Sequence, residues 1–404
     1  MKNWVEKKLD EVCELITCGV AAKPQYVSDG IPFLSAKNVK DGQIIWSGYN
    51  CVTEKTHKEL TKNNKPLAGD LLYTRVGSYG EAAVIEDDIE FSVFVSLTLI
   101  KVDKSVLNSY YLKHYLNSDL VKRLAKKSIS GSGVGNLNVG TVRNFPILLP
   151  PLSEQQRIVA LLDEAFAAIA KAKANAEQNL KNAKELFESY LQGVFENKGE
   201  GWEEKMLKEI GIAQTGTTPK TADKENYGDF IPFIKPADID IKGNGEIRYD
   251  NDGLSEQGLK NGRKMLEGSI LMVCIGATIG KVGFVDRDVT CNQQINSLTV
   301  KKEFSTKFIY YALSTKGFFE QVILNSAQAT LPIINKGKWE TLTISFPKSK
   351  IEQEDIANKF DLLQIETKKL EAIYTQKITD LEELKKSVLQ KAFCGELKTN
   401  IVVV

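Results

Sequence analysis

The sequence predicts an α+β protein in which a mixed, β-rich domain followed by a long helix occurs twice, the two helices pairing as an antiparallel coiled coil. Three observations lead to this prediction: segments recur at a constant offset, short apolar runs alternate with turn residues, and two stretches carry apolar residues at steps of four and three. The predicted boundaries define two β-rich domains, two helices and a tail: 1–150, 151–198, 199–348, 349–397 and 398–404.

The duplication is visible as a series of matched segments. The offset between the copies stays between 197 and 200 residues, and the matches keep their order along the chain. The matched pairs are 4–12 with 202–210, 31–34 with 231–234, 69–72 with 268–271, 154–163 with 352–361, and 191–195 with 389–393. Five matches in order indicate two copies of one structural unit.

The first part of each copy reads as a sheet with short helices. Apolar runs of strand length, bounded by Gly, Asn, Asp and Pro, predict strands at 70–74, 83–85, 93–100, 269–275 and 297–300. Apolar residues at helical spacing predict short helices at 110–116, 120–124 and 308–313. Their aromatic residues are interpreted as core packing.

The second part of each copy reads as a long helix that begins after a proline, Pro151 in the first copy and Pro347 in the second. Each helix carries a line of apolar residues, the seam. Alanines on the seam of the first helix stand where the seam of the second helix has large residues, which favours close pairing of the two helices. A dyad between the copies would make the helices antiparallel. The seam is predicted to contain Ile158, Leu162, Ala165, Ile169, Ala172, Ala176, Ala183, Leu186, Ile356, Phe360, Leu363, Leu370, Tyr374, Leu381 and Leu384.

Composition places the chain among ordinary globular proteins. It has 404 residues with 53 Lys+Arg and 52 Asp+Glu, and this near balance permits nucleic-acid binding without requiring it. Apolar runs long enough to span a bilayer and an N-terminal signal peptide are both missing, so we expect a cytoplasmic protein. The six cysteines are scattered and are interpreted as buried apolar residues.

The patterns expected of an enzyme are absent from the sequence. Only two histidines occur, His57 and His114, neither at metal-ligand spacing, which argues against a zinc site and a histidine-based triad. The glycine-rich stretch 131–135 follows no strand pattern, and 276–281 is one residue short of a phosphate loop. We therefore expect no catalytic residues, no bound metal and no cofactor in this chain.

Several motifs resemble the specificity subunit of type I restriction–modification systems. The stretch 150–158, Pro-Pro-Leu-Ser-Glu-Gln-Gln-Arg-Ile, is similar to the opening of the family's central conserved region, and 389–397 is similar to its C-terminal ending. Gly216-Thr-Thr-Pro-Lys220, the segment 228–238 and Asn292-Gln-Gln-Ile295 resemble elements of a target recognition domain. The first domain departs from this pattern at 19–24 and 91–94.

The resemblance implies a non-catalytic subunit in which each recognition domain reads one half of a bipartite site in double-stranded DNA. The helix pair would set the spacer and dock two methyltransferase subunits, which would hold S-adenosylmethionine, and a restriction/translocase subunit would join them. A coiled-coil adaptor that does not bind DNA and a nuclease are the competing interpretations. Polar loop residues are the candidates for DNA contact: Lys37, Asn38, Arg75, Ser78, Tyr79, Ser132, Asn136, Asn138, Thr217, Thr218, Lys220, Lys235, Asp238, Thr278, Lys281, Asn292, Gln293, Gln294, Gln328 and Thr330.

Overall fold

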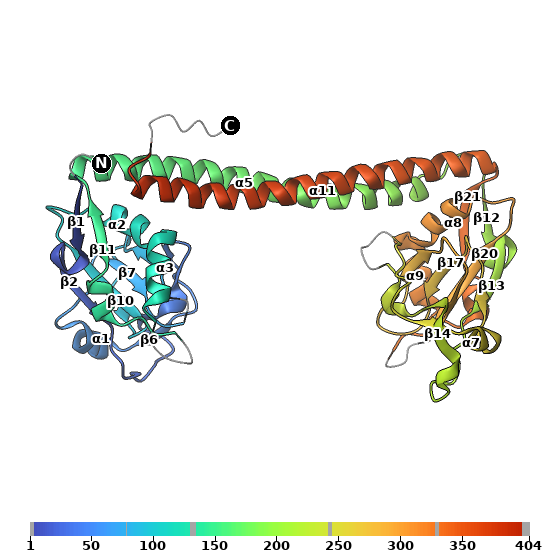
Figure 1. Ribbon diagram of the computed structural model, residues 1–404, viewed down its shortest axis with the longest axis horizontal. Coiled ribbons are helices and arrows are strands. Elements are labelled where there is room, and N and C mark those ends of the chain that lie inside the picture. The colour runs from blue at the N-terminus through green and yellow to red at the C-terminus, as the bar shows by residue number, and fades with distance from the viewer. Residues whose placement is uncertain (1–3, 78, 130–134, 241–244, 328–330, 398–404) are drawn as a thin grey trace. The chain divides into compact units, whose positions relative to one another are not determined.

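The computed structural model describes residues 4–77, 79–129, 135–240, 245–327 and 331–397. The chain forms two compact units, residues 1–177 with 375–404 and residues 178–374. Each unit contains one sheet-rich domain and a part of each long helix, as the labels in Figure 1 show. Across the described residues, no helix combines the length and apolar character needed to cross a membrane.

The first unit is built on a four-stranded antiparallel sheet. Its strands, in spatial order, are β2 (Cys13–Cys18), β10 (Leu97–Val102), β7 (Leu71–Thr74) and β8 (Ala82–Val84). The smaller sheets contain β6 (Asn50–Val52), β3 (Ile31–Leu34) and β9 (Ser92–Val93), then β1 (Val5–Lys8) with β11 (Pro146–Leu149), and β4 (Val39–Lys40) with β5 (Gln43–Ile44). The helices are η1 (Leu9–Glu11), η2 (Ala36–Asn38), α1 (Glu54–Thr61), α2 (Ser109–Leu116), α3 (Asp119–Lys127) and α4 (Val139–Arg143).

The second unit repeats this topology. Its four-stranded sheet has the order β13 (Gly211–Thr215), β20 (Ile295–Val300), β17 (Ile270–Val273) and β18 (Val282–Phe284). The other strands are β15 (Gly253–Leu254), β14 (Tyr227–Ile234), β19 (Val289–Cys291) and β16 (Lys264–Met265) in one sheet, and β12 (Trp202–Met206) with β21 (Thr343–Pro347) in another. The helices are α6 (Leu207–Ile210), η3 (Lys224–Asn226), η4 (Pro236–Asp238), α7 (Glu256–Asn261), α8 (Thr306–Leu313), α9 (Lys316–Asn325) and α10 (Lys336–Trp339). The matching strand order confirms the predicted duplication.

Both faces of each four-stranded sheet are covered. Along β7, Leu71 and Tyr73 belong to the core under the helices, whereas Leu72 belongs to the core shared with the smaller sheet. Alternate residues of a strand point to opposite faces, so a strand covered on both sides is apolar throughout. One strand prediction was wrong: the run 93–100 is split, because the chain turns between β9 and β10 and the two strands join different sheets.

The long helices are α5 (Leu152–Glu196) and α11 (Lys350–Phe393), and they pair antiparallel within each unit. In the first unit, the early part of α5 shares a core with the late part of α11, through Ile158 and Val388 among others. Lys173 also donates to Glu382 across this pair at 2.6 Å. In the second unit, the late part of α5 packs on the early part of α11, where the Tyr190 and Phe360 rings lie 5.8 Å apart.

The exposed fractions correct part of the predicted seam. Leu186, Leu370 and Leu384 are 47%, 36% and 38% exposed, so these three side chains lie outside the buried face. Ala172, Ile356, Leu363 and Tyr374 are half-buried. The remaining predicted positions are buried: Ile158, Leu162, Ala165, Ile169, Ala176, Ala183, Phe360 and Leu381.

The seam differs from the prediction mainly on α11, where one predicted apolar line is buried and the other lies at the edge of the contact. The buried line keeps the heptad spacing through Phe360, Thr367, Leu381 and Val388, whereas Leu370 and Leu384 belong to the other line. Ala357 is buried beside the half-buried Ile356. Towards the end of α5 the buried residue is Leu191, and the neighbouring Tyr190 is 42% exposed.

Candidate nucleic-acid interface

Two motifs that are distant in the sequence meet in the second unit. The backbone N–H of Thr217 donates to the carbonyl oxygen of Cys291 at 2.9 Å, and the Thr218 hydroxyl donates to Oε1 of Gln293. A Cβ atom on Gly216 would lie 2.1 Å from the carbonyl oxygen of Asn292, so only glycine allows this approach. The segments 216–218 and 291–294 therefore form one surface.

The turn between β17 and β18 continues this surface. The N–H of Cys274 donates to the carbonyl oxygen of Gln294 at 2.7 Å, which fixes the turn 274–281 beside the glutamines. Thr278 is exposed on that turn, and Lys281 is half-buried with its Nζ 3.4 Å from the carbonyl oxygen of Ile239. We call residues 216–218, 274–281 and 291–294 the second rim. It gathers seven of the candidate residues: Thr217, Thr218, Thr278, Lys281, Asn292, Gln293 and Gln294.

Within the second rim the polar side chains differ in freedom. Gln293 is exposed, and its amide nitrogen has no hydrogen-bond partner among the described residues, whereas its oxygen accepts from Thr218. Asn292 donates to Oε1 of Gln294 at 3.0 Å and accepts from the N–H of Gln294 at 3.1 Å. Asn292 and Gln294 thus brace the loop, and Gln293 presents hydrogen-bonding groups to solvent.

The first unit forms the same surface from different side chains. A Cβ on Gly19 would lie 2.0 Å from the carbonyl oxygen of Val93, and Val95 donates to the carbonyl oxygen of Val20 at 2.9 Å. We call residues 19–21, 75–77, 79–80 and 93–96 the first rim. Val20 and Ala21 stand here where the second rim has Thr217 and Thr218, so the backbone geometry repeats and the polar groups do not.

Three candidates prove to be parts of the framework, because buried polar groups need hydrogen-bond partners. Asn38 is fully buried; its amide donates to the carbonyl oxygens of Ile45 and Ser47. Arg75 is 8% exposed and donates to the carbonyl oxygens of Leu137 and Val95 and to Asn136. Asp238 is 2% exposed and accepts from the N–H of Lys235 and from Asn251. These side chains hold loops in this structure, and their contact with DNA stays a prediction.

The other candidates are scattered. Lys37 and Lys220 are exposed, Tyr79 packs on the core, and Lys235 pairs with Asp252 at 2.8 Å. Asn136 and Asn138 are exposed, and Asn138 caps α4 through the N–H of Gly140 at 2.8 Å. Four candidates lie outside the described residues: Ser78, Ser132, Gln328 and Thr330.

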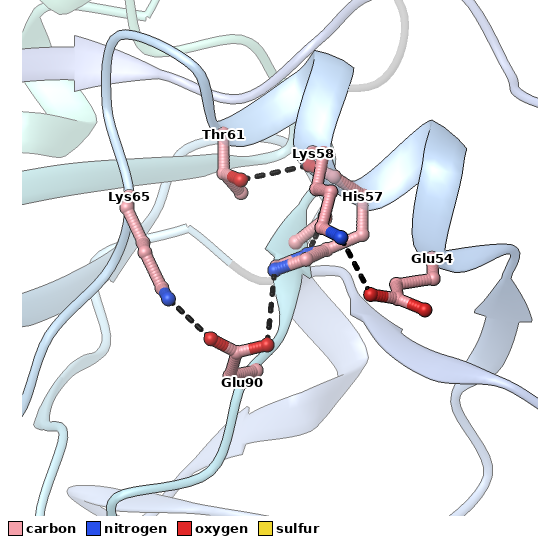
Figure 2. Close-up of polar contacts among 7 residues, drawn as sticks. Glu54, His57, Lys58, Thr61, Lys65 and Glu90 are labelled. Atoms are coloured by element: carbon pink, nitrogen blue, oxygen red, sulfur yellow. Dashed lines mark hydrogen bonds and ion pairs between the residues drawn. The ribbon is translucent and has the colours of Figure 1, made fainter.

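A charged cluster beneath α1 superficially resembles a catalytic triad (Figure 2). His57 Nδ1 lies 2.9 Å from the Ser92 hydroxyl, and His57 Nε2 lies 3.8 Å from Glu90, which also pairs with Lys65. Ser92 is 1% exposed within β9, so its hydroxyl is shielded from solvent in this structure. Burial lowers the pKa of His57, and the cluster serves to attach α1 to the sheet.

A buried glutamine joins each domain to its long helix, a role that the sequence motif alone did not reveal. Gln155 accepts from the N–H of Asn108 at 2.8 Å and donates to the carbonyl oxygens of Val106 and Pro150 at 2.9 and 2.8 Å. Gln353 accepts from the N–H of Ser305 and donates to the carbonyl oxygen of Pro347 in the same way. The glutamine of the Glu-Gln pair repeated in the sequence is thus a structural clamp at the start of both helices.

Acidic, cysteine and histidine side chains do not gather into a possible metal site anywhere in the described ranges. The polar side chains of the second rim are instead mainly hydrogen-bonding amides and hydroxyls. Such groups recognise the edges of bases in a DNA groove.

Comparison with known proteins gives a consistent family assignment. The family model described as the type I restriction modification DNA specificity domain matches residues 1–181 and again residues 199–380. The putative type I restriction enzyme MjaX specificity subunit of Methanocaldococcus jannaschii is 23% identical, with 98% of this chain and 94% of that protein covered. The HindI specificity subunit of Haemophilus influenzae is 24% identical, with 66% and 56% covered.

Two solved structures share the fold. A chain from a study of complex assembly and conformational transition of the type I R-M system has a TM-score of 0.75 at 18% identity, with 98% of this chain and 99% of that chain covered. The HsdS subunit from Thermoanaerobacter tengcongensis has a TM-score of 0.65 at 18% identity, with 98% and 97% covered.

Proposed function

The chain belongs to the type I restriction modification DNA specificity family, and we propose that it is the DNA sequence-recognition subunit of a type I restriction–modification complex. Each sheet-rich domain reads one half of a bipartite site in double-stranded DNA. The observation that carries this proposal is the repetition of the family match together with the repeated rim, because two equivalent surfaces suit two half-sites.

Reading by the second rim follows from its side-chain chemistry. An amide that presents both a donor and an acceptor can pair with the N6 and N7 edge of adenine in the major groove, at about 1–3 kcal/mol of discrimination. Gln293 is the exposed amide of this rim, and Thr218 orients it through its oxygen. We therefore assign base reading to Gln293 and support of the loop to Asn292 and Gln294.

We infer that the chain has no active site of its own and takes its chemistry from partners. Two methyltransferase subunits would dock on the helix pair and hold S-adenosylmethionine, and a restriction/translocase subunit would complete the complex in the cytoplasm. Exposed apolar residues on α11 support docking on the helices: Ile351, Leu362, Ile365 and Ile373. The helix pair would set the spacer between the half-sites.

A methylation map of a host that expresses the chain with its methyltransferase tests the proposal. We expect methylation at one bipartite sequence, and Gln293→Ala should relax base preference in only one of its halves. Gln178 is an exposed glutamine on α5 that donates to Asn182 at 2.8 Å, and Gln178→Ala is the matched control that should leave the map unchanged. Methylation that does not depend on this chain would favour the adaptor interpretation.

A further inference from the structure

Helices α3 and α9 occupy equivalent positions in the two units. Their N-caps, Ser118 and Thr315, each accept a hydrogen bond from the N–H three residues later. Counting from these caps, the buried residues Val121 and Ala125 of α3 match the buried Phe318 and Val322 of α9. The inner faces of the two helices are therefore apolar in both copies.

Each helix lies directly beside its rim. A Cβ on Gly80, in the first rim, would lie 3.8 Å from Cγ of Lys122 on α3. A Cβ on Gly280, in the second rim, would lie 2.4 Å from Cδ2 of Phe319 on α9. Both glycines have a left-handed backbone, with φ of 91° and 90°, so the turns and the helices correspond.

The outer faces of the two helices have opposite chemistry. Lys122, Lys126 and Lys127 of α3 correspond by count to Phe319, Ile323 and Leu324 of α9. With Arg123, helix α3 carries four cations and one acidic residue, Asp119. Helix α9 carries one cation, Lys316, and one acidic residue, Glu320. The difference is confined to the solvent side, because the buried positions match.

Three of the α3 cations are available to a ligand. Lys122 is engaged by Glu81 at 2.5 Å. Arg123, Lys126 and Lys127 are exposed and form no ion pair with the acids that the structure describes. Cations near the C-terminus of a helix stabilise its dipole, but α9 ends without any, so the fold does not require them.

We propose that α3 is a phosphate-binding face, on which Arg123, Lys126 and Lys127 contact the backbone of the duplex whose bases meet the first rim. This inference rests on the proposed function, since it needs DNA at that rim. Lys and Arg contacts to phosphate fix the position of a protein on a duplex without reading its sequence. The first rim has Val20 and Ala21 where the second rim has two threonines, so it offers fewer polar groups to DNA. The phosphate contacts of α3 supply the binding affinity that these groups would otherwise provide.

The salt dependence of binding measures these contacts. Each phosphate neutralised by a cation adds about 0.9 to the magnitude of the slope of log K against log salt concentration. In the full chain, Lys126→Gln with Lys127→Gln should lower that magnitude by about 1.8. The variant should bind DNA more weakly than the wild type at 50 mM salt, and the ratio of the two affinities should shrink roughly twelvefold between 50 and 200 mM salt. The duplex is one selected by the wild-type chain from a random pool.

Two matched variants control for net charge and position. Lys55→Gln with Lys62→Gln removes the same charge from exposed positions at α1 and should keep the wild-type slope. Ile323→Gln with Leu324→Gln alters the corresponding positions of α9 without changing charge and should also keep it. An equal fall in slope for the α1 variant would mean a general charge effect and would overturn the proposal.

The outcomes separate this inference from the proposed function. If the wild type binds its selected duplex no better than a scrambled one, the proposed function fails. If the wild type discriminates and the α3 variant keeps the wild-type slope, only the phosphate-binding face is refuted. A variant that selects a different base sequence would also refute it, because the cations would then read bases.

Discussion

Replacing Gln155 with alanine should destabilise the first unit through one identifiable set of contacts. The side chain is fully buried and makes three hydrogen bonds, to Asn108, Val106 and Pro150. At about 0.5–1.5 kcal/mol each, their loss amounts to about 1.5–4.5 kcal/mol. For a unit of this size that corresponds to a fall in Tm of roughly 3–18 °C, measured by scanning calorimetry. Hydrogen exchange at the N–H of Asn108 should accelerate.

The neighbouring residue provides the control. Gln156 is exposed and has no side-chain hydrogen bond among the described residues, so Gln156→Ala should change the stability by less than about 0.5 kcal/mol. Gln353→Ala should repeat the effect of Gln155→Ala in the second unit, and the two losses should add, because the sites share no partner. Equal Tm values for the Gln155→Ala and Gln156→Ala variants would refute the role of Gln155 as a clamp.

Three further predictions concern the helices and the histidines. Ala176 is 2% exposed, so Ala176→Leu should lower the free energy of unfolding by about 1–3 kcal/mol through overpacking, measured by urea unfolding. Ala174→Leu, on the exposed side of the helix, should leave that free energy almost unchanged. Equal effects of the two variants would contradict close pairing. Burial lowers the pKa of His57 and of His114 below the ordinary 6.5, so the unfolded chain binds these protons more readily. The free energy of unfolding should thus be highest above pH 6.5 and decrease as the pH falls below that value. The double variant His57→Asn with His114→Asn should show a smaller decrease, and an unchanged pH profile would contradict this prediction. Adding one heptad to both long helices should lengthen each by about 10 Å, or about three base pairs of spacer in a methylation map, with the half-sites unchanged; a fixed spacer with methylation intact would show that the helices are not the ruler.

The duplication and the helix positions were predictable because periodicity is a property of the chain itself. The exact buried line was less so, since neighbouring positions of a helix share a face and a sequence does not state which one the partner covers. Ile356 and Ala357 illustrate the difficulty: the larger apolar residue was predicted, and the alanine is the one buried, at 1% exposure. Tertiary packing decides between such neighbours.

The rims could be predicted only in part, for a chemical reason. The side chains that read bases are also those that satisfy the backbone groups of a loop. Asn38 and Gln293 both carry a side-chain amide in a polar stretch of sequence, so the sequence does not distinguish their roles. In the structure Asn38 is fully buried and donates to two carbonyl oxygens, whereas Gln293 is exposed. The contact between Gly216 and Asn292 joins segments far apart in the sequence, so only the fold reveals that the motifs share one surface.

The two copies differ where a difference leaves the framework intact. Gln155 and Gln353 make the same clamp, and Asp163 and Asp361 both tie a domain helix to a long helix, although the partner is His114 in one copy and Tyr311 in the other. Lys126 and Ile323, in contrast, differ in charge at equivalent solvent-facing positions. Buried clamps fix each rim relative to its helix, while the side chains on the rim and the adjoining helix can change without cost to the core. Two half-sites that differ in sequence would require that separation, because each rim would have to change alone while the joint to the helix pair stays the same.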